Sequence, residues 1–88
     1  MRIEKLRGHE QANCHTIHEG LTIKLVSYRT VVLIYNVIDK NIECTGLYSM
    51  TTRKHIGWFM NQYIQGYNYH DIKHAYENNY ILELKGGN

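Results

Sequence analysis

Six histidines and two cysteines are the side chains of this 88-residue chain best suited to metal or nucleophile chemistry. Cys14 and His18 are four residues apart, as are His70 and His74, so either pair would offer two zinc ligands on a helix. A structural zinc site needs four converging ligands, and the chain has no Cys-x-x-Cys or His-Glu-x-x-His spacing. We therefore expect surface histidines, no bound metal and no cofactor, with metal binding by the histidine-rich segment 1–20 left as an open alternative.

Enzyme chemistry has less support than binding. A Cys/His pair, or carboxylates such as Glu43 and Asp71, could act in catalysis. However, no candidate nucleophile lies on a tight turn, and no two carboxylates stand at a defined spacing. We expect a protein that is not an enzyme and has no catalytic residue.

The run Thr51-Thr52-Arg53-Lys54-His55 combines groups that bind anions. The threonines supply hydroxyls, the next three residues supply cations, and a helix that begins here has free backbone N–H groups. The combination favours a phosphate or a partner's carboxylate. In the plainer interpretation the threonines cap the helix and the cations are solvated. Cations at a helix start oppose its dipole, which favours a functional role.

Trp58 lies on the polar side of the expected helix, in a row with Lys54 and Gln62. A large aromatic in such a place usually has a partner. Either it anchors an interface, or the N-terminal segment folds across it as a lid. We predict a partner-binding surface made of Arg53, Lys54, His55, Trp58, Gln62, Tyr67 and Tyr69.

Nucleic acid is the alternative partner. A groove with stacking platforms could form from Arg29, Arg53, Lys54, Lys73, Tyr28, Tyr48, Tyr67 and Tyr69. Ten Lys and Arg residues are balanced by eight Asp and Glu residues, so the net charge is only +2. This weak charge places nucleic acid second to a protein partner.

Hydrophobic periodicity predicts the elements that carry these residues. Period-two alternation and β-branched runs indicate strands over residues 21–26, 31–38, 42–48 and 80–85, with a bulge at Gly46. A main helix is expected over about 51–65, capped by Thr51 or Thr52 and ended by Gly66. Its buried stripe should consist of Ile56, Phe59, Met60, Tyr63 and Ile64.

The remaining segments are less periodic. A short second helix is expected around residues 72–76, ended by Asn78-Asn79, or else residues 67–76 and 80–85 form a hairpin. Residues 1–20 should be a loose helix or an arm. The predicted fold is a single α+β domain over 1–88 with its core in 21–85. A mostly antiparallel sheet of three to four strands packs against the main helix and the short second helix.

Length and composition set the outer limits. The chain is 43% hydrophobic and 20% charged, which is typical of globular proteins and not of disordered ones. A chain this short buries only roughly 60–65% of its unfolded surface, so a homodimer is a reasonable expectation. The charged N-terminus and the lack of a long apolar run predict a cytoplasmic protein without a membrane partner. In that compartment Cys14 and Cys44 would be reduced.

Two motifs carry a resemblance to a known family. They are Ser27-Tyr28-x-Thr30 at a strand entry and Tyr48-Ser49-x-Thr51-Thr52-x-Lys54-His55 at a helix entry. The pattern resembles a small family of short proteins of unknown function encoded by bacteriophages and other mobile elements, although Val31 stands where such proteins usually have proline. The resemblance covers about residues 25–65, without the N-terminal segment and the last strand. It implies a phage origin, and small phage proteins are often stoichiometric inhibitors of host machinery, including anti-CRISPR proteins.

These observations predict a phage-encoded, non-enzymatic binding protein in the cytoplasm of the host cell. We expect it to inhibit or modulate a host protein or ribonucleoprotein, with a host-defence system such as a CRISPR effector as the specific hypothesis. The alternative is a small nucleic-acid-binding accessory or regulatory protein.

Overall fold

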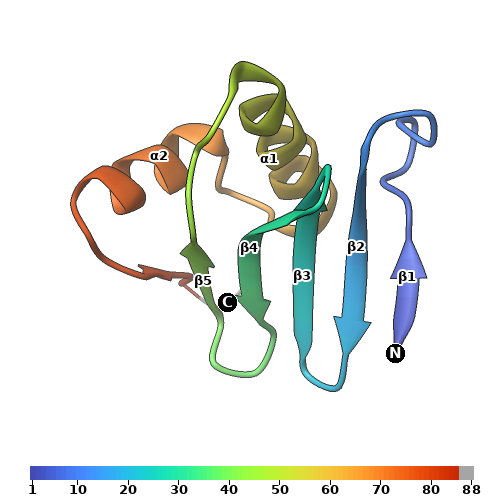
Figure 1. The fold of residues 1–88 in the computed structure, drawn as a ribbon. Coiled ribbons are helices and arrows are strands. Elements are labelled where there is room, and N and C mark those ends of the chain that lie inside the picture. The colour runs from blue at the N-terminus through green and yellow to red at the C-terminus, as the bar shows by residue number, and fades with distance from the viewer. Residues whose placement is uncertain (86–88) are drawn as a thin grey trace.

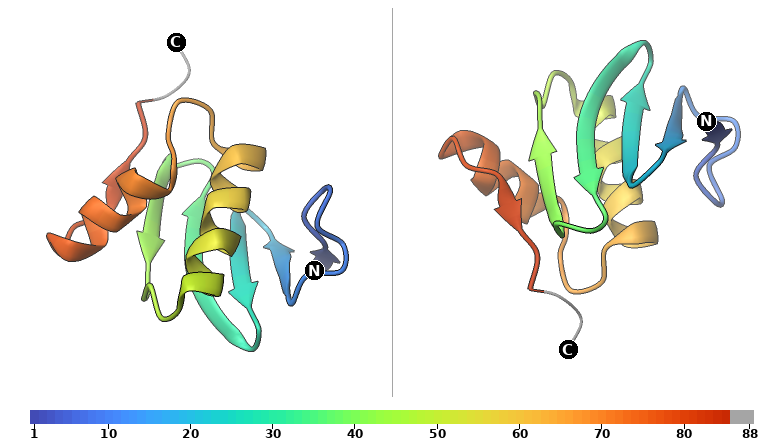
Figure 2. Two further views of the ribbon diagram at one scale, coloured as in Figure 1. Left: turned by 90° about the horizontal axis from the view of Figure 1, so that it is seen from above. Right: turned by 90° about the horizontal axis from the view of Figure 1, so that it is seen from below.

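Six short strands pair in the order in which they occur in the chain, each antiparallel to its neighbours. The computed structural model describes residues 1–85. Within them the elements are β1 (Arg2–Glu4), β2 (Cys14–Glu19), β3 (Thr22–Ser27), β4 (Thr30–Asn36), β5 (Asn41–Cys44), α1 (Met50–Tyr63), α2 (Tyr69–Glu77) and β6 (Leu82–Glu83). Both helices cover the same face of the sheet, and β6 returns after them to pair with β5 (Figures 1 and 2). This confirms the α+β fold, with six strands where three or four were expected.

The N-terminal segment is not the loose helix or arm that we expected. It supplies two strands, joined by a loop whose Leu6 side chain is fully buried. Cys14 and Thr16 of β2 point into the core opposite Ser27 and Leu25 of β3. Because these inward residues are small and partly polar, their period-two alternation does not look hydrophobic in the sequence.

The two faces of the sheet differ in cover. The face under the helices carries Leu25, Leu33 and Ile42, which belong to the main core cluster. On the opposite face, Ile17 and Ile34 are half-buried and do not belong to that cluster. A bulge does occur, but in the β3–β4 pairing beside Leu25 and not at the expected Gly46.

Helix α1 packs its predicted apolar stripe on the sheet. Ile56, Phe59, Met60 and Ile64 are buried, and Tyr63 packs half-buried against them. This confirms the helical period of the stripe. The helix itself spans residues 50–63, so it begins and ends slightly earlier than expected.

The ends of α1 differ from the predicted caps. Ser49 is the N-cap, and its hydroxyl accepts a hydrogen bond from the backbone N–H of Thr52 (3.2 Å). Thr52 itself is buried, so its hydroxyl lies in the interior and not at the exposed start of the helix. Ile64 is the C-cap, and Gly66, two residues further on, adopts the left-handed backbone that favours glycine.

Helix α2 exists, so the alternative hairpin is wrong. Asn68 and Asp71 begin it with a capping box: Asn68 accepts from the backbone N–H of His70, and Asp71 accepts from that of Asn68. Asn78 and Asn79 end it, as expected. The helix is longer than predicted and β6 is shorter. Within residues 1–85, neither helix is both long and apolar enough to cross a membrane.

Gly57 offers a test of the α1 packing. It lies in the middle of the helix, and the only atom near a Cβ added there is the Cβ of Tyr69, at an ordinary contact distance of 3.9 Å. We expect Gly57→Ala to raise the free energy of unfolding by about 0.5–1 kcal/mol, because alanine favours helix. Urea denaturation measures it. Gly66→Ala is the matched control and should destabilise the protein, because its left-handed backbone disfavours a side chain.

Candidate binding surface around the first helix

His55 does not lie on the exposed face of α1, where we expected it. It is 2% exposed, and its Nδ1 lies 2.8 Å from the hydroxyl of Ser27 on β3. The Ser27 hydroxyl also lies 3.0 Å from that of Thr52. Thr52, His55 and Phe59 succeed one another at helical spacing on the inward side of α1. His55 is therefore part of the helix–sheet contact and does not lie on the exposed surface that we predicted to bind a partner.

The buried cluster unites the two sequence motifs singled out above. Ser27 comes from the strand-entry motif, and Thr52 and His55 come from the helix-entry motif, in which the exposed N-cap Ser49 bonds to Thr52. Tyr28 follows Ser27 in a left-handed conformation, and its ring centroid lies 5.8 Å from that of His55. The residues of both motifs thus hold α1 on β3.

Burial lowers the pKa of His55. Loss of solvent is the largest cause, and the positive charges of Lys54, His9 and Lys5 act in the same direction. The imidazole is therefore neutral at pH 7. A hydroxyl and an imidazole at 2.8 Å resemble a nucleophile and its base, but both residues are only 2% exposed, so the pair does not face solvent.

Trp58 is half-buried beneath the N-terminal loop. The His9 ring stacks flat on the indole, with ring centroids 3.6 Å apart and planes 9° apart. The backbone N–H of Arg7 donates to the side chain of Gln62 (2.8 Å), which ties the same loop to α1. The lid interpretation is therefore correct for one face of the ring. Trp58, Gln62 and Asn61 still line an open cleft with Arg7 and His9.

A second groove, with a volume of about 380 Å³, lies between the first turns of α1 and α2. It brings together three residues of the predicted surface, Arg53, Lys54 and Tyr69. Met50, His70 and Lys73 complete its lining, and none of the lining residues is acidic. We refer to these six residues as the α1–α2 groove. The sequence prediction included Tyr69, and Lys73 as part of the nucleic-acid alternative, but not Met50 or His70, because the position of α2 beside α1 is a tertiary feature.

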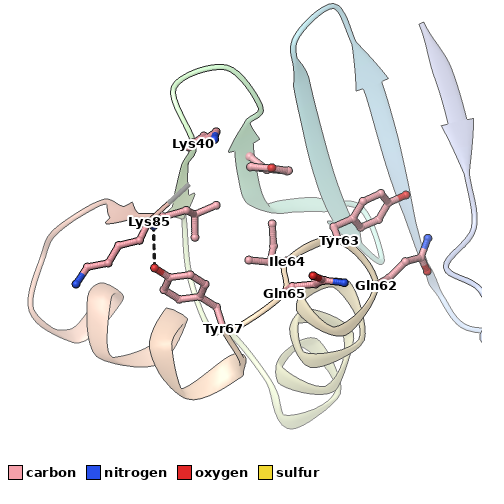
Figure 3. A pocket seen from close by; sticks show the side chains of 9 residues that line it. Lys40, Gln62, Tyr63, Ile64, Gln65, Tyr67 and Lys85 are labelled. Carbon is pink, nitrogen blue, oxygen red and sulfur yellow. Dashed lines mark hydrogen bonds between the residues drawn. The ribbon is translucent and has the colours of Figure 1, made fainter. Parts of the chain in front are cut away.

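Tyr67 lies apart from this groove. It lines a pocket at the other end of α1, shown in Figure 3, where its hydroxyl accepts a hydrogen bond from the backbone N–H of Lys85 (2.9 Å). Gln62 lines both this pocket and the Trp58 cleft. The seven predicted residues are thus divided among the α1–α2 groove, the Trp58 cleft, the pocket of Figure 3 and the buried core.

The metal and thiol chemistry considered above has little structural support. In the described part of the chain, no three His, Cys, Asp or Glu side chains come together as metal ligands. Cys14 and Cys44 are free thiols on β2 and β5, with two strands between them. Burial raises the pKa of both thiols, which disfavours the reactive thiolate.

Removing the Ser27 hydroxyl tests the buried cluster. Ser27→Ala leaves the Nδ1 of His55 without its partner in the interior, and we expect a loss of about 1–3 kcal/mol in the free energy of unfolding, measured in urea. Ser49→Ala, which removes the N-cap and its hydroxyl bond to Thr52 but keeps the Ser27–His55 pair, should cost about 1 kcal/mol. An unchanged free energy of unfolding in Ser27→Ala would contradict the role of the cluster.

The pKa of His55 predicts a pH dependence. Since it is lowered from 6.5 in the folded protein, unfolding takes up a proton at His55 in mildly acidic solution. The free energy of unfolding should therefore decrease as the pH falls below the pKa that His55 has in the unfolded chain. Above that pKa, His55 should contribute no pH dependence. Urea denaturation across this range should give a shallower pH dependence for His55→Gln. Parallel curves for the two proteins would refute the prediction.

A family model described as a family of unknown function matches residues 1–83. The matched region includes the N-terminal segment and β6, which we had expected to lie outside the family resemblance. No curated protein and no solved structure matches the chain. The chain belongs to the family of unknown function DUF8033.

Proposed function

We propose that the protein is a non-enzymatic binding protein whose cationic helical face docks onto an acidic region of a macromolecular partner, which it inhibits or modulates. The charge of α1 carries this proposal: the helix presents Arg53 and Lys54 and contains no Asp or Glu. The α1–α2 groove adds His70 and Lys73 without any acidic lining residue. A surface of one sign attracts and orients a partner of the opposite sign.

Trp58 supplies an anchor beside this charge. Lys54 Nζ lies 5.9 Å from the centre of its ring, and Arg7 and Gln62 lie in the same cleft. A partly exposed aromatic ring with a polar rim is the usual arrangement of residues that dominate a binding free energy. This supports a protein partner.

The specific partner we propose is a host protein or ribonucleoprotein, with a host-defence system such as a CRISPR effector as the leading hypothesis. Its support is the resemblance of the Ser27–Thr30 and Tyr48–His55 motifs to phage-encoded proteins. Nucleic acid is the second candidate, because the α1–α2 groove combines four basic side chains with Tyr69. Binding that weakens steeply with salt would favour nucleic acid.

Variants at the helical face test the proposal. After affinity capture from host lysate and identification of the bound species, the purified partner should bind Trp58→Ala roughly 30-fold more weakly, which corresponds to about 2 kcal/mol. Lys54→Glu should also weaken binding, because it reverses a charge on the proposed surface. Titration calorimetry measures both effects, and thermal unfolding checks that each variant folds.

Lys40→Glu is the matched control, since Lys40 is exposed in the β4–β5 turn away from the groove. It makes the same charge change and should bind like the wild type. Equal losses for Lys40→Glu and Lys54→Glu would show that net charge alone matters. Unchanged binding by both Trp58→Ala and Lys54→Glu would place the interface elsewhere.

A further inference from the structure

Two buried hydrogen-bond donors have no partner, and both belong to residues that line the α1–α2 groove. They are Nε of Arg53 and the hydroxyl of Tyr69. They are the buried side-chain nitrogen and oxygen atoms that lack a partner in the described residues. The other buried polar side chains, such as those of Ser27 and His55, are hydrogen-bonded.

The coincidence has a physical meaning. Buried polar atoms in folded proteins nearly always have a partner, because leaving one unsatisfied costs free energy. Here the two unsatisfied groups belong to different helices, and both of their residues line the same groove. The guanidinium N–H can only donate, and the tyrosine hydroxyl can donate as well. The missing partner is therefore an acceptor.

The charge around the groove indicates what kind of acceptor fits. Lys54, His70 and Lys73 also line it. The nearest acids in sequence are already bonded: Asp71 accepts from the backbone of Asn68, and Glu77 pairs with Lys73 (3.7 Å). An anionic oxygen is the acceptor that this set of donors and charges stabilises most.

The apolar part of the groove distinguishes between possible partners. Met50 is 74% exposed, and besides the imidazole of His70 the groove has one aromatic ring, that of Tyr69. An acidic peptide with an apolar side chain next to its carboxylate would cover Met50 and reach the donors together. A nucleic acid strand would instead need a longer series of phosphate contacts and several stacking platforms.

We infer that the α1–α2 groove binds an acidic peptide segment of the partner, whose carboxylate accepts hydrogen bonds from Arg53 and Tyr69 while a neighbouring apolar side chain covers Met50. The inference rests on the proposed function and specifies the chemistry of the same surface. Both donor atoms are covered in the free protein, so binding includes a rotation of these side chains toward the ligand. The bonds then form in a partly desolvated place, where they are stronger than in water.

The test is a nuclear magnetic resonance titration of the full chain with a capped peptide in which aspartate alternates with leucine. We expect shifts of the Arg53, Tyr69 and Lys73 amides, and at least tenfold weaker binding for the same peptide with asparagine in place of aspartate. Arg53→Gln should lose about tenfold and Tyr69→Phe several-fold in affinity. Tyr69→Phe should leave stability unchanged or raised, because it removes an unsatisfied hydroxyl.

Tyr67→Phe is the matched control, because its hydroxyl is bonded to Lys85 outside the groove. It should bind the peptide like the wild type. Peptide binding that is unaffected by Arg53→Gln and Tyr69→Phe would overturn the inference. So would binding of inorganic phosphate or an oligothymidylate strand without binding of the peptide. Partner binding that is lost in Trp58→Ala but kept in both groove variants would leave the proposed function intact and refute the inference alone.

Discussion

A buried hydrogen-bonded cluster of Ser27, Thr52 and His55 determines how α1 lies on the sheet. Hydrophobic contacts alone are not directional, and a smooth apolar stripe can slide or rotate on a sheet. Three polar groups that must find one another in the interior allow one position, because any other leaves them unpaired. That position places Arg53 and Lys54 in the lining of the α1–α2 groove and brings Trp58 beneath the N-terminal loop.

Because of the same cluster, the residues of one short motif are divided between the core and the α1–α2 groove. Along Thr52-Arg53-Lys54-His55, the outer two residues are buried and the inner two line the groove. The cationic neighbours help to keep His55 neutral, since their charge lowers its pKa. A neutral, buried imidazole then supports a positively charged surface without adding to the repulsion within it.

Sequence patterns predicted those parts of the fold in which local periodicity and packing agree. The stripe from Ile56 to Ile64 has an unambiguous helical spacing, and α1 follows it. Strand β2 was not predicted because its inward residues include the polar Thr16. The sequence alone does not show that Thr16 lies opposite Leu25 of β3. His55 was misplaced for a similar reason, since its partner lies 28 residues earlier in the chain. Predicting the groove also required the position of α2 relative to α1, which the hydrophobic periodicity of the two helices does not encode.

The two walls of the α1–α2 groove are anchored unequally. Helix α1 buries five residues, including Thr52 and His55 of the polar cluster, whereas α2 buries only Ile72 and Ala75. Local opening of α2 therefore costs less free energy than opening of α1. Beyond α2 the chain is attached to the sheet through the two register pairs of β6 with β5. A ligand that holds the walls together would protect this weakly anchored end of the chain, and amide hydrogen exchange would slow at the far edge of the sheet, remote from the ligand itself.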